Sequence, residues 1–254
     1  MNGQVNKLPH RIQKICRLSI PGGDRFLDIG CGNGAFAILF GEIFGFRNLY
    51  GVDVSIEAVN QANERGVNAI CADADKEALP YDDGYFDVVF AGEVIEHLLN
   101  SDFMIDEIFR VLKLGGMCIV TTPNLASWYN RIQLLFGYQP YAIPASHIHR
   151  GAGALWSSAR DKMVYGDCYS PSSGITEGFK HHISFYTVRS LVSLLEMHGF
   201  RTVTVAGASF DEIVFQMPGL LVKMVKMFDM VVSNIFSSLA SRSIIVVKRP
   251  DDAE

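Results

Sequence analysis

The chain has 254 residues, of which 22 are Lys or Arg and 27 are Asp or Glu, and its formal net charge is −5. The length suits one large domain at about 150 residues per domain. A hydrophobic content of 49% allows a sizeable core and excludes a disordered chain. The acidic balance disfavours a general nucleic-acid coat protein. The cysteines are widely spaced and form no Cys-x-x-Cys pair, so we expect reduced thiols in a cytoplasmic protein without a zinc ribbon.

Short apolar runs alternate with helical patterns through the first half of the chain. Strands are expected at 26–29, 49–54, 67–71, 86–91 and 117–121. Ser55 is placed to cap a helix that runs to Gly66, and Ser101 to cap one that runs to Gly115 and Gly116. This alternation predicts right-handed βαβ units and a parallel sheet, so the fold class is α/β.

The regular pattern stops after residue 122. Residues 123–186 have no strong period and hold both tryptophans, and we expect an insertion on the substrate side. Its aromatic residues suit the wall of an aromatic or lipid-like pocket, or equally a small core of the insertion itself: Trp128, Tyr129, Tyr138, Tyr141 and Trp156. His147 and His149 are a further source of a base or a ligand, although alternating histidines are more often loop residues.

Regularity returns in the last part of the chain. Thr187 is expected to cap a helix that ends near Gly199. Strands are expected to follow at 200–205 and 243–247, and the second of them completes the sheet.

A second insertion, helical and spanning residues 207–242, is expected between the last two strands. Its apolar stretch at 213–240 is interrupted by Lys223, Lys226 and Asp229, so we do not expect a membrane span. The default interpretation is a helix that packs on the sheet or at a dimer contact. The alternative is a helix on a membrane surface that serves a lipid-linked acceptor.

The first predicted strand is joined to its helix by a glycine-rich loop, residues 30–34 (GCGNG). Such a loop lets the backbone approach a ligand closely, and together with Asp53 it satisfies a loose dinucleotide fingerprint. Asp28, just before the loop, would repel a pyrophosphate but would suit a ligand with an amino group or a sulfonium. S-adenosylmethionine carries both groups, and its ribose would still bind a carboxylate at Asp53.

Four segments share their order and spacing with a known family: FLDIGCGNG at 26–34, GVDVS at 51–55, ALPYDDGYFDVVFAGEVIEH at 78–97 and RVLKLGG at 110–116. They resemble class I S-adenosylmethionine-dependent methyltransferases, in particular the ubiquinone-biosynthesis O-methyltransferase-like (type 11/type 12) branch. The resemblance implies a Rossmann-like seven-stranded, mostly parallel sheet with helices on both faces. It also implies an antiparallel last strand and an insertion after the fifth strand.

The resemblance implies roles for individual residues around an S-adenosylmethionine cofactor. In the family, the glycine loop holds the methionine part, the acid after the second strand binds both ribose hydroxyls, and an acid after the third strand meets the adenine. The matching residues here are Asp28, Gly30, Cys31, Gly32, Asn33, Gly34, Asp53, Val54 and Gly92. Asp73 and Asp75 both qualify as the adenine acid, and the spacing to Pro80 favours Asp75.

The motif at residues 93–97, Glu-Val-Ile-Glu-His, is the best candidate for activating the methyl acceptor, because an oxygen of high pKa needs a general base or a metal. It resembles the Glu-x-x-Glu-His of two metal-using branches, the ubiquinone-biosynthesis O-methyltransferases and the small-RNA 2′-O-methyltransferases. We therefore take Glu93, His97 and His182 as candidate catalytic residues, and Glu93, Glu96 and His97 as candidate metal ligands. The same string is common in members without a metal, so a divalent metal is not expected.

We expect a single methyltransferase domain over residues 1–254 that transfers a methyl group to an oxygen of a small or lipid-like molecule. Nucleic acid is not an expected partner, peripheral membrane contact stays open, and the protein is expected as a monomer or homodimer. The alternatives are an RNA 2′-O-methyltransferase, an NAD-linked oxidoreductase and a non-catalytic cofactor-binding module. Asp28 and the motif at 93–97 count against the oxidoreductase.

Overall fold

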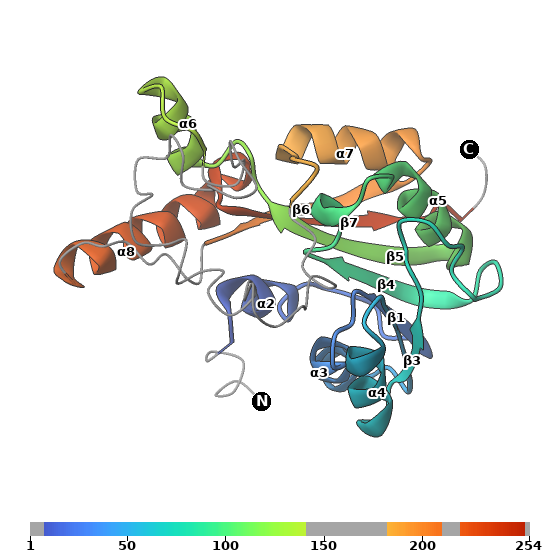
Figure 1. Cartoon of the computed structure of the whole chain (residues 1–254). Coiled ribbons are helices and arrows are strands. Elements are labelled where there is room, and N and C mark those ends of the chain that lie inside the picture. Colours follow the sequence, from blue (N-terminus) through green and yellow to red (C-terminus); the bar gives the residue numbers. More distant parts are fainter. Residues whose placement is uncertain (1–7, 141–181, 210–218, 252–254) are drawn as a thin grey trace, which may run out of the picture.

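The computed structural model describes residues 8–140, 182–209 and 219–251, with a seven-stranded sheet at its centre (Figure 1). The strands are β1 (Arg25–Ile29), β2 (Asn48–Asp53), β3 (Asn68–Cys71), β4 (Phe86–Gly92), β5 (Leu112–Pro123), β6 (Arg201–Ala208) and β7 (Arg242–Lys248). They are arranged in the order β3-β2-β1-β4-β5-β7-β6, and β7 runs antiparallel to both of its neighbours. The predicted Rossmann-like, mostly parallel sheet with an antiparallel last strand is confirmed.

Helices cover both faces of the sheet, as predicted. They are α2 (His10–Ile15), α3 (Ala35–Phe44), α4 (Ile56–Glu64), α5 (Ser101–Val111), α6 (Trp128–Leu135), α7 (Val188–Met197) and α8 (Gly219–Ile235). Successive strand residues point to opposite faces, so Phe26 of β1 joins a core cluster with α2, α3 and α4, and Leu27 joins the cluster with α5 and α7. Figure 1 shows these two groups of helices on opposite sides of the sheet.

Side-chain caps begin α4, α5 and α7, in two cases at the predicted residue. Ser55 caps α4, and Thr187 caps α7 with a reciprocal capping box, so both predictions are confirmed. For α5 the prediction is wrong by one residue. Asn100 is the cap, because its side chain accepts a hydrogen bond from the main-chain N–H of Phe103, and Ser101 is the first helical residue.

Helix α5 also ends earlier than predicted, at Val111, and β5 starts at the next residue, Leu112. The guanidinium of Arg249 stabilises this short connection. Its Nη1 donates to the main-chain oxygens of Phe109, Arg110 and Leu112 at 2.9, 3.1 and 2.6 Å. Carbonyls at a helix end otherwise lack partners, so the segment predicted to finish the helix can instead open a strand of 12 residues.

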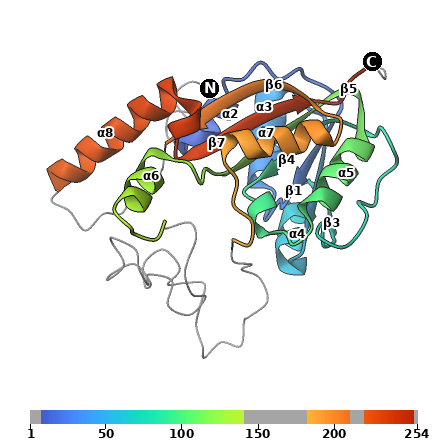
Figure 2. The ribbon, with the colours of Figure 1, turned by 90° about the horizontal axis from the view of Figure 1, so that it is seen from above.

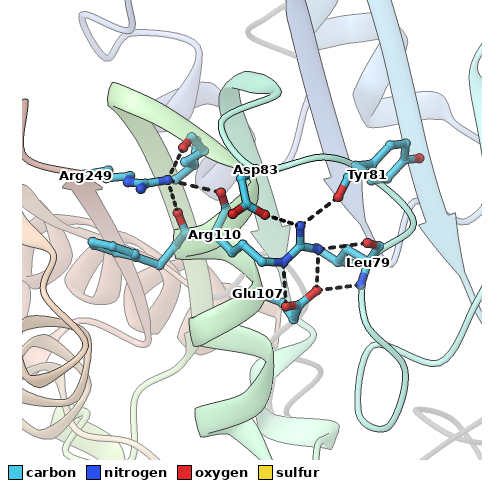
Figure 3. Close-up of polar contacts among 8 residues, drawn as sticks. Leu79, Tyr81, Asp83, Glu107, Arg110 and Arg249 are labelled. Atoms are coloured by element: carbon cyan, nitrogen blue, oxygen red, sulfur yellow. Dashed lines mark hydrogen bonds and ion pairs between the residues drawn. The ribbon is translucent and has the colours of Figure 1, made fainter.

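The loop between β3 and β4 is fixed onto α5 by Arg110 (Figure 3). The Arg110 guanidinium donates to the main-chain oxygens of Leu79 and Tyr81 at 2.9 and 2.8 Å. It also pairs with the carboxylates of Glu107 and Asp83 at 2.7 and 2.8 Å. Glu107 in turn accepts a hydrogen bond from the main-chain N–H of Leu79 at 2.7 Å. Arg110 therefore holds this loop at several points along its length.

A histidine joins α5 to α7. The ring nitrogens of His198 lie 2.6 Å from the carboxylate of Asp106 and 2.9 Å from that of Asp102. Burial of the ring opposes its protonation, but the hydrogen bonds to the two carboxylates outweigh burial and raise the pKa of His198.

The two predicted insertions are described in part. Helix α6 follows β5, whereas Tyr141, His147, His149 and Trp156 lie outside the described residues. Helix α8 lies between β6 and β7, within the range predicted for the second insertion, and the residues just before it are not described. Within the described ranges, no helix has the length and apolarity that a membrane crossing requires.

Candidate active site

A cavity of about 240 Å³ lies at the carboxyl ends of β1, β2, β3 and β4. The chain leaves β1 toward β2 and β3 on one side and later returns to β4 on the other, and open α/β sheets bind ligands at such a switch point. The wall consists of strand ends and the first residues of the loops that follow: Ile29, Gly30, Val52, Asp53, Val54, Ala72, Asp73, Ala74, Gly92, Glu93, Val94, His97 and Leu98.

The glycine loop takes backbone conformations that other residues avoid. Gly30, Gly32 and Gly34 have φ angles of 73°, 52° and 77°, in the left-handed region. A Cβ atom on Gly30 would also lie 2.5 Å from the side chain of Val94. Gly30 lines the cavity, and the remaining loop residues, 31–34, lie outside the cavity wall.

Asp53 ends β2, and both of its oxygens are held by main-chain N–H groups. Oδ2 accepts a hydrogen bond from Gly32 at 2.8 Å, and Oδ1 accepts one from Ser55 at 2.9 Å. These bonds couple the glycine loop to β2 and orient the carboxylate in the cavity wall. Each carboxylate oxygen can accept further hydrogen bonds, so Asp53 remains able to bind the two hydroxyls of a ribose. Val54 lies beside it in the wall.

Asp28 lies behind the cavity wall, and its side chain is only 2% exposed. Burial, together with the nearby Asp53 carboxylate, raises the pKa of Asp28 to about 8. Oδ2 of Asp28 has no hydrogen-bond partner among the residues that the structure describes. The carboxyl is therefore mostly protonated at neutral pH, and it can attract a cation only if binding lowers its pKa. The predicted repulsion of a pyrophosphate is weakened for the same reason.

The two acids after β3 differ in what they contact. Asp73 lines the cavity and pairs with Lys76 at 2.9 Å. Asp75 is 5% exposed, and its Oδ1 accepts a hydrogen bond from the main-chain N–H of Asn100 at 2.8 Å. Because Asp73 lines the cavity and Asp75 does not, the structure favours Asp73 as the acid nearest an adenine, whereas the sequence spacing favoured Asp75. Sequence spacing does not show that the second carboxylate turns toward the start of α5.

Glu93 forms part of the wall in an unusual backbone conformation, with a φ of 59°. Its carboxylate pairs with Arg11 of α2 at 2.7 Å and with Arg242 of β7, and it accepts a hydrogen bond from the Thr121 hydroxyl at 3.1 Å. These contacts favour a role in fixing the wall over the predicted roles as base and metal ligand. Nothing in the motif at 93–97 indicates the two arginines, because they come from distant parts of the chain.

Glu96, His97 and His182 form a cluster beside the cavity. One donor atom from each lies within 4.8 Å of the others, and the two imidazole rings meet edge to face at 4.8 Å. Glu96 is 2% exposed and accepts a hydrogen bond from the Thr122 hydroxyl at 2.9 Å, while its Oε1 has no hydrogen-bond partner in the described part of the chain. Burial raises the pKa of Glu96 to about 7. His97 is the member that lines the cavity.

Main-chain contacts explain why His182 joins this cluster from a distant segment. The carbonyl oxygen of Glu96 accepts hydrogen bonds from the N–H groups of Ile183 and Ser184 at 2.7 and 3.1 Å. One carboxylate and two imidazoles are donors that a divalent metal accepts. A metal held here would therefore have Glu96, His97 and His182 as its ligands, with His182 in place of the predicted Glu93.

The segment that builds this cavity is similar to a known protein family. Residues 27–120 match the family described as "Methyltransferase domain". The match covers the part of the chain from β1 to β5, and over this segment the chain is similar to methyltransferases.

Two curated relatives match this chain over a similar stretch. The 27-O-demethylrifamycin SV methyltransferase of Amycolatopsis mediterranei is 39% identical over 105 residues, which are 39% of this chain and 38% of the relative. The 2-methyl-6-phytyl-1,4-hydroquinone methyltransferase of Synechocystis is 35% identical over 109 residues, 42% of this chain and 34% of the relative. The chain thus spans well under half the length of both relatives.

The fold comparison extends farther along the chain. An S-adenosylmethionine-dependent methyltransferase structure from Mesorhizobium loti superposes with a TM-score of 0.60 over 96% of this chain and 100% of that chain. The sequence identity of 18% means that this likeness shows the common fold.

Proposed function

We propose that this protein is an S-adenosylmethionine-dependent methyltransferase, and that it transfers the methyl group to an oxygen of a small or lipid-like molecule. The observation that carries the proposal is that Asp53 and His97 line the same cavity, so a ribose-binding acid and an imidazole of the acceptor-side cluster face one space. The names of the two relatives support this acceptor class, since one acts on a 27-O-demethyl compound and the other on a phytyl-substituted hydroquinone.

The cofactor supplies a methyl group already activated by its sulfonium, so the protein needs no nucleophile of its own. The contribution of the chain is to bind and align the reactants. We assign the ribose hydroxyls to Asp53, the adenine side to Asp73, and the close backbone approach to Gly30. Gly92, at the end of β4, also lines the cavity.

His97 is assigned as the general base that takes the proton of the acceptor hydroxyl. It is the member of the histidine–glutamate cluster that lines the cavity, and His182 and Glu96 lie next to it. A Glu96 carboxyl with a pKa of about 7 can share a proton with the imidazoles at neutral pH. The Thr122 hydroxyl orients that carboxyl.

Calorimetric titration with S-adenosylhomocysteine and with NADH tests the cofactor side. We expect S-adenosylhomocysteine to bind and NADH not to bind. Asp53→Ala should weaken S-adenosylhomocysteine binding about 10- to 100-fold, since hydrogen bonds to a charged group are lost. Asp82→Ala removes an exposed acid outside the cavity wall and should leave the affinity unchanged. NADH binding in preference would support the oxidoreductase, and an unchanged affinity in Asp53→Ala would remove the assigned role.

The acceptor is tested by release of S-adenosylhomocysteine from S-adenosylmethionine in the presence of quinols, phenols or an RNA oligonucleotide. Turnover with a hydroxyl compound supports the proposal, and turnover with RNA alone would select the RNA methyltransferase. Cofactor binding without turnover of any acceptor would favour a binding module.

With an acceptor in hand, His97→Gln tests the base. We expect kcat to fall about 10²- to 10⁴-fold, the usual contribution of general base catalysis, with the affinity for S-adenosylhomocysteine retained. A chelator should leave the wild-type rate unchanged. A rate that a chelator abolishes and a divalent cation restores would instead assign Glu96, His97 and His182 to a metal.

A further inference from the structure

Helix α8 turns apolar residues toward solvent. Six of them recur at helical spacing and are between 49% and 74% exposed: Leu220, Met224, Met227, Phe228, Val231 and Ile235. The buried side of the same helix includes Asp229 and Ser233, which are 0% and 1% exposed. A surface helix ordinarily shows the opposite arrangement. Packing against the sheet, our default interpretation, therefore does not explain the exposed face.

A buried polar contact fixes α8 in this orientation. Oδ1 of Asp229 accepts hydrogen bonds from the Trp128 indole N–H at 2.7 Å and from the Ser241 hydroxyl at 2.6 Å. The Trp128 ring meets the Phe228 ring edge to face at 5.0 Å. Rotating α8 to bury its apolar face would break these hydrogen bonds and leave Trp128 and Ser241 without them. The apolar face is thus held outward.

Helix α6 repeats the arrangement beside α8. Asn130 and Gln133 are 0% and 1% exposed, whereas Leu134, Leu135 and Phe136 are 57%, 78% and 69% exposed. Figures 1 and 2 both show α6 and α8 at the same end of the molecule, beyond the sheet. The exposed apolar residues of α8 and residues 134–136 are called the α6–α8 face below.

The charges of these two helices indicate what the face contacts. Arg131 of α6 and Lys223 and Lys226 of α8 are exposed, and Asp229, the acid of α8, is buried. Within the described residues of α6 and α8, every exposed charged side chain is thus positive, and apolar residues flanked by positive charge fit the surface of a bilayer that contains anionic lipids. A second copy of the chain would bring like charges together, which disfavours self-association through this face.

We propose that the α6–α8 face binds the surface of an anionic lipid bilayer, with α8 lying in the plane of the headgroups. The 17 residues of α8 give a length of about 25 Å. Membrane binding by this face requires no turnover, so it can be tested without the proposed function. Only its consequence, that a lipid-like acceptor reaches the cavity from the membrane, rests on the proposed function.

Contacts connect the segments next to the face with the cavity wall. Asn124, just before α6, donates hydrogen bonds to the main-chain oxygens of Ser238 and Ala240, which follow α8. Arg242, at the start of the strand that follows, pairs with Glu93 in the cavity wall. Docking of the face therefore brings the carboxyl edge of the sheet to the membrane, where a lipid-like acceptor would enter.

Vesicle flotation of the full chain tests the proposal, with vesicles of phosphatidylcholine alone or mixed with phosphatidylglycerol. We expect binding to the mixed vesicles and much weaker binding to phosphatidylcholine alone. Lys223→Gln and Lys226→Gln should each reduce the partition coefficient about fivefold. The double variant Met224→Glu/Met227→Glu should reduce it at least about tenfold, since charges are placed in the buried face. Met197→Glu, the same change at an 83% exposed residue of α7, is the matched control and should bind like wild type.

Two further measurements make the result decisive. The affinity for S-adenosylhomocysteine should be the same in all variants, because none of these residues lines the cavity. If S-adenosylhomocysteine binding were lost in every variant, the result would concern the assigned cofactor site and would not test the α6–α8 face. Wild-type protein that floats no better with anionic vesicles than in buffer overturns the proposal, as does unchanged binding by the Met224→Glu/Met227→Glu variant. A wild-type dimer that this variant converts to monomer, without vesicle binding, would assign the face to a second copy.

Discussion

Replacing Arg110 by alanine should destabilise the protein through the loop that leads from the cavity to β4. The substitution removes two hydrogen bonds from a charged donor to the main-chain oxygens of Leu79 and Tyr81. It also leaves the Glu107 carboxylate, which is 12% exposed, without its cation. The Asp83 carboxylate also loses its ion pair with Arg110, but this side chain is 78% exposed and solvent screens the pair.

The expected loss follows from these contacts. Each hydrogen bond from a charged donor contributes about 1.5 kcal/mol at the lower end of the measured range. The ion pair with Glu107 adds about 0.5 kcal/mol after solvent screening, and the pair with Asp83 adds almost nothing. The sum is about 3.5 kcal/mol, which corresponds to a fall in Tm of roughly 7 to 14 °C for a chain of this size.

Urea denaturation of wild type and Arg110→Ala measures this difference, with Arg189→Ala on the exposed side of α7 as the control arginine. A cycle with Glu107→Gln isolates the ion pair, whose coupling energy should be about 0.5 kcal/mol. The affinity for S-adenosylhomocysteine should also fall, because Asp73 lies in the same loop. A loss no larger than that of Arg189→Ala would refute the reasoning.

The pH dependence of Arg110→Ala provides a second check. The hydrogen bond from Arg110 lowers the pKa of Glu107 in the folded state. A depressed folded pKa stabilises the protein above the unfolded pKa, and this contribution is lost as the pH falls through the folded pKa. Wild type should therefore lose more stability than Arg110→Ala on acidification.

Gly30→Ala should cost about 1 to 2 kcal/mol from its left-handed φ and weaken S-adenosylhomocysteine binding, because the new Cβ would meet Val94. Gly32→Ala is the control, because it has the same kind of backbone strain but its Cβ would have no described atom within 4 Å. If both variants bound S-adenosylhomocysteine equally well, the contact of the Gly30→Ala Cβ with Val94 would have no role in binding. His198, whose pKa is raised by the two α5 aspartates, should stabilise the fold fully below its unfolded pKa and lose this contribution as the pH rises through its folded pKa. Urea denaturation of wild type and His198→Gln at a series of pH values gives their free energies of unfolding, and we expect these to converge at high pH. A difference that stays constant with pH would contradict this role of His198.

The parts of the fold that local sequence specifies were predictable. The alternation of apolar runs and capped helices predicted the parallel sheet. Ser55 and Thr187 predicted helix starts correctly because a cap depends only on residues within one turn. Gly30 and Asp53 could also be predicted as cavity residues, since their spacing along one βαβ unit determines where they lie.

What depends on distant partners could not be predicted in the same way. The early end of α5 depends on Arg249, which follows the last strand. The contacts of Glu93 depend on Arg11 and Arg242, and nothing in the motif at 93–97 indicates them. The outward-facing apolar residues of α8 follow from one buried acid, Asp229, which in the sequence resembles only an interruption of an apolar run.

The place of β7 in the sheet has a consequence for synthesis of the protein. β7 lies between β5 and β6, which are both made before it, and β6 has no other neighbour in the described sheet. Until β7 leaves the ribosome, the nascent chain therefore exposes the unpaired edge of β5 and an unattached β6. Such open edges pair readily with other chains. Aggregation during translation should thus be most frequent just before Arg242 emerges, and Glu93 in the cavity wall acquires its β7 partner only after that moment.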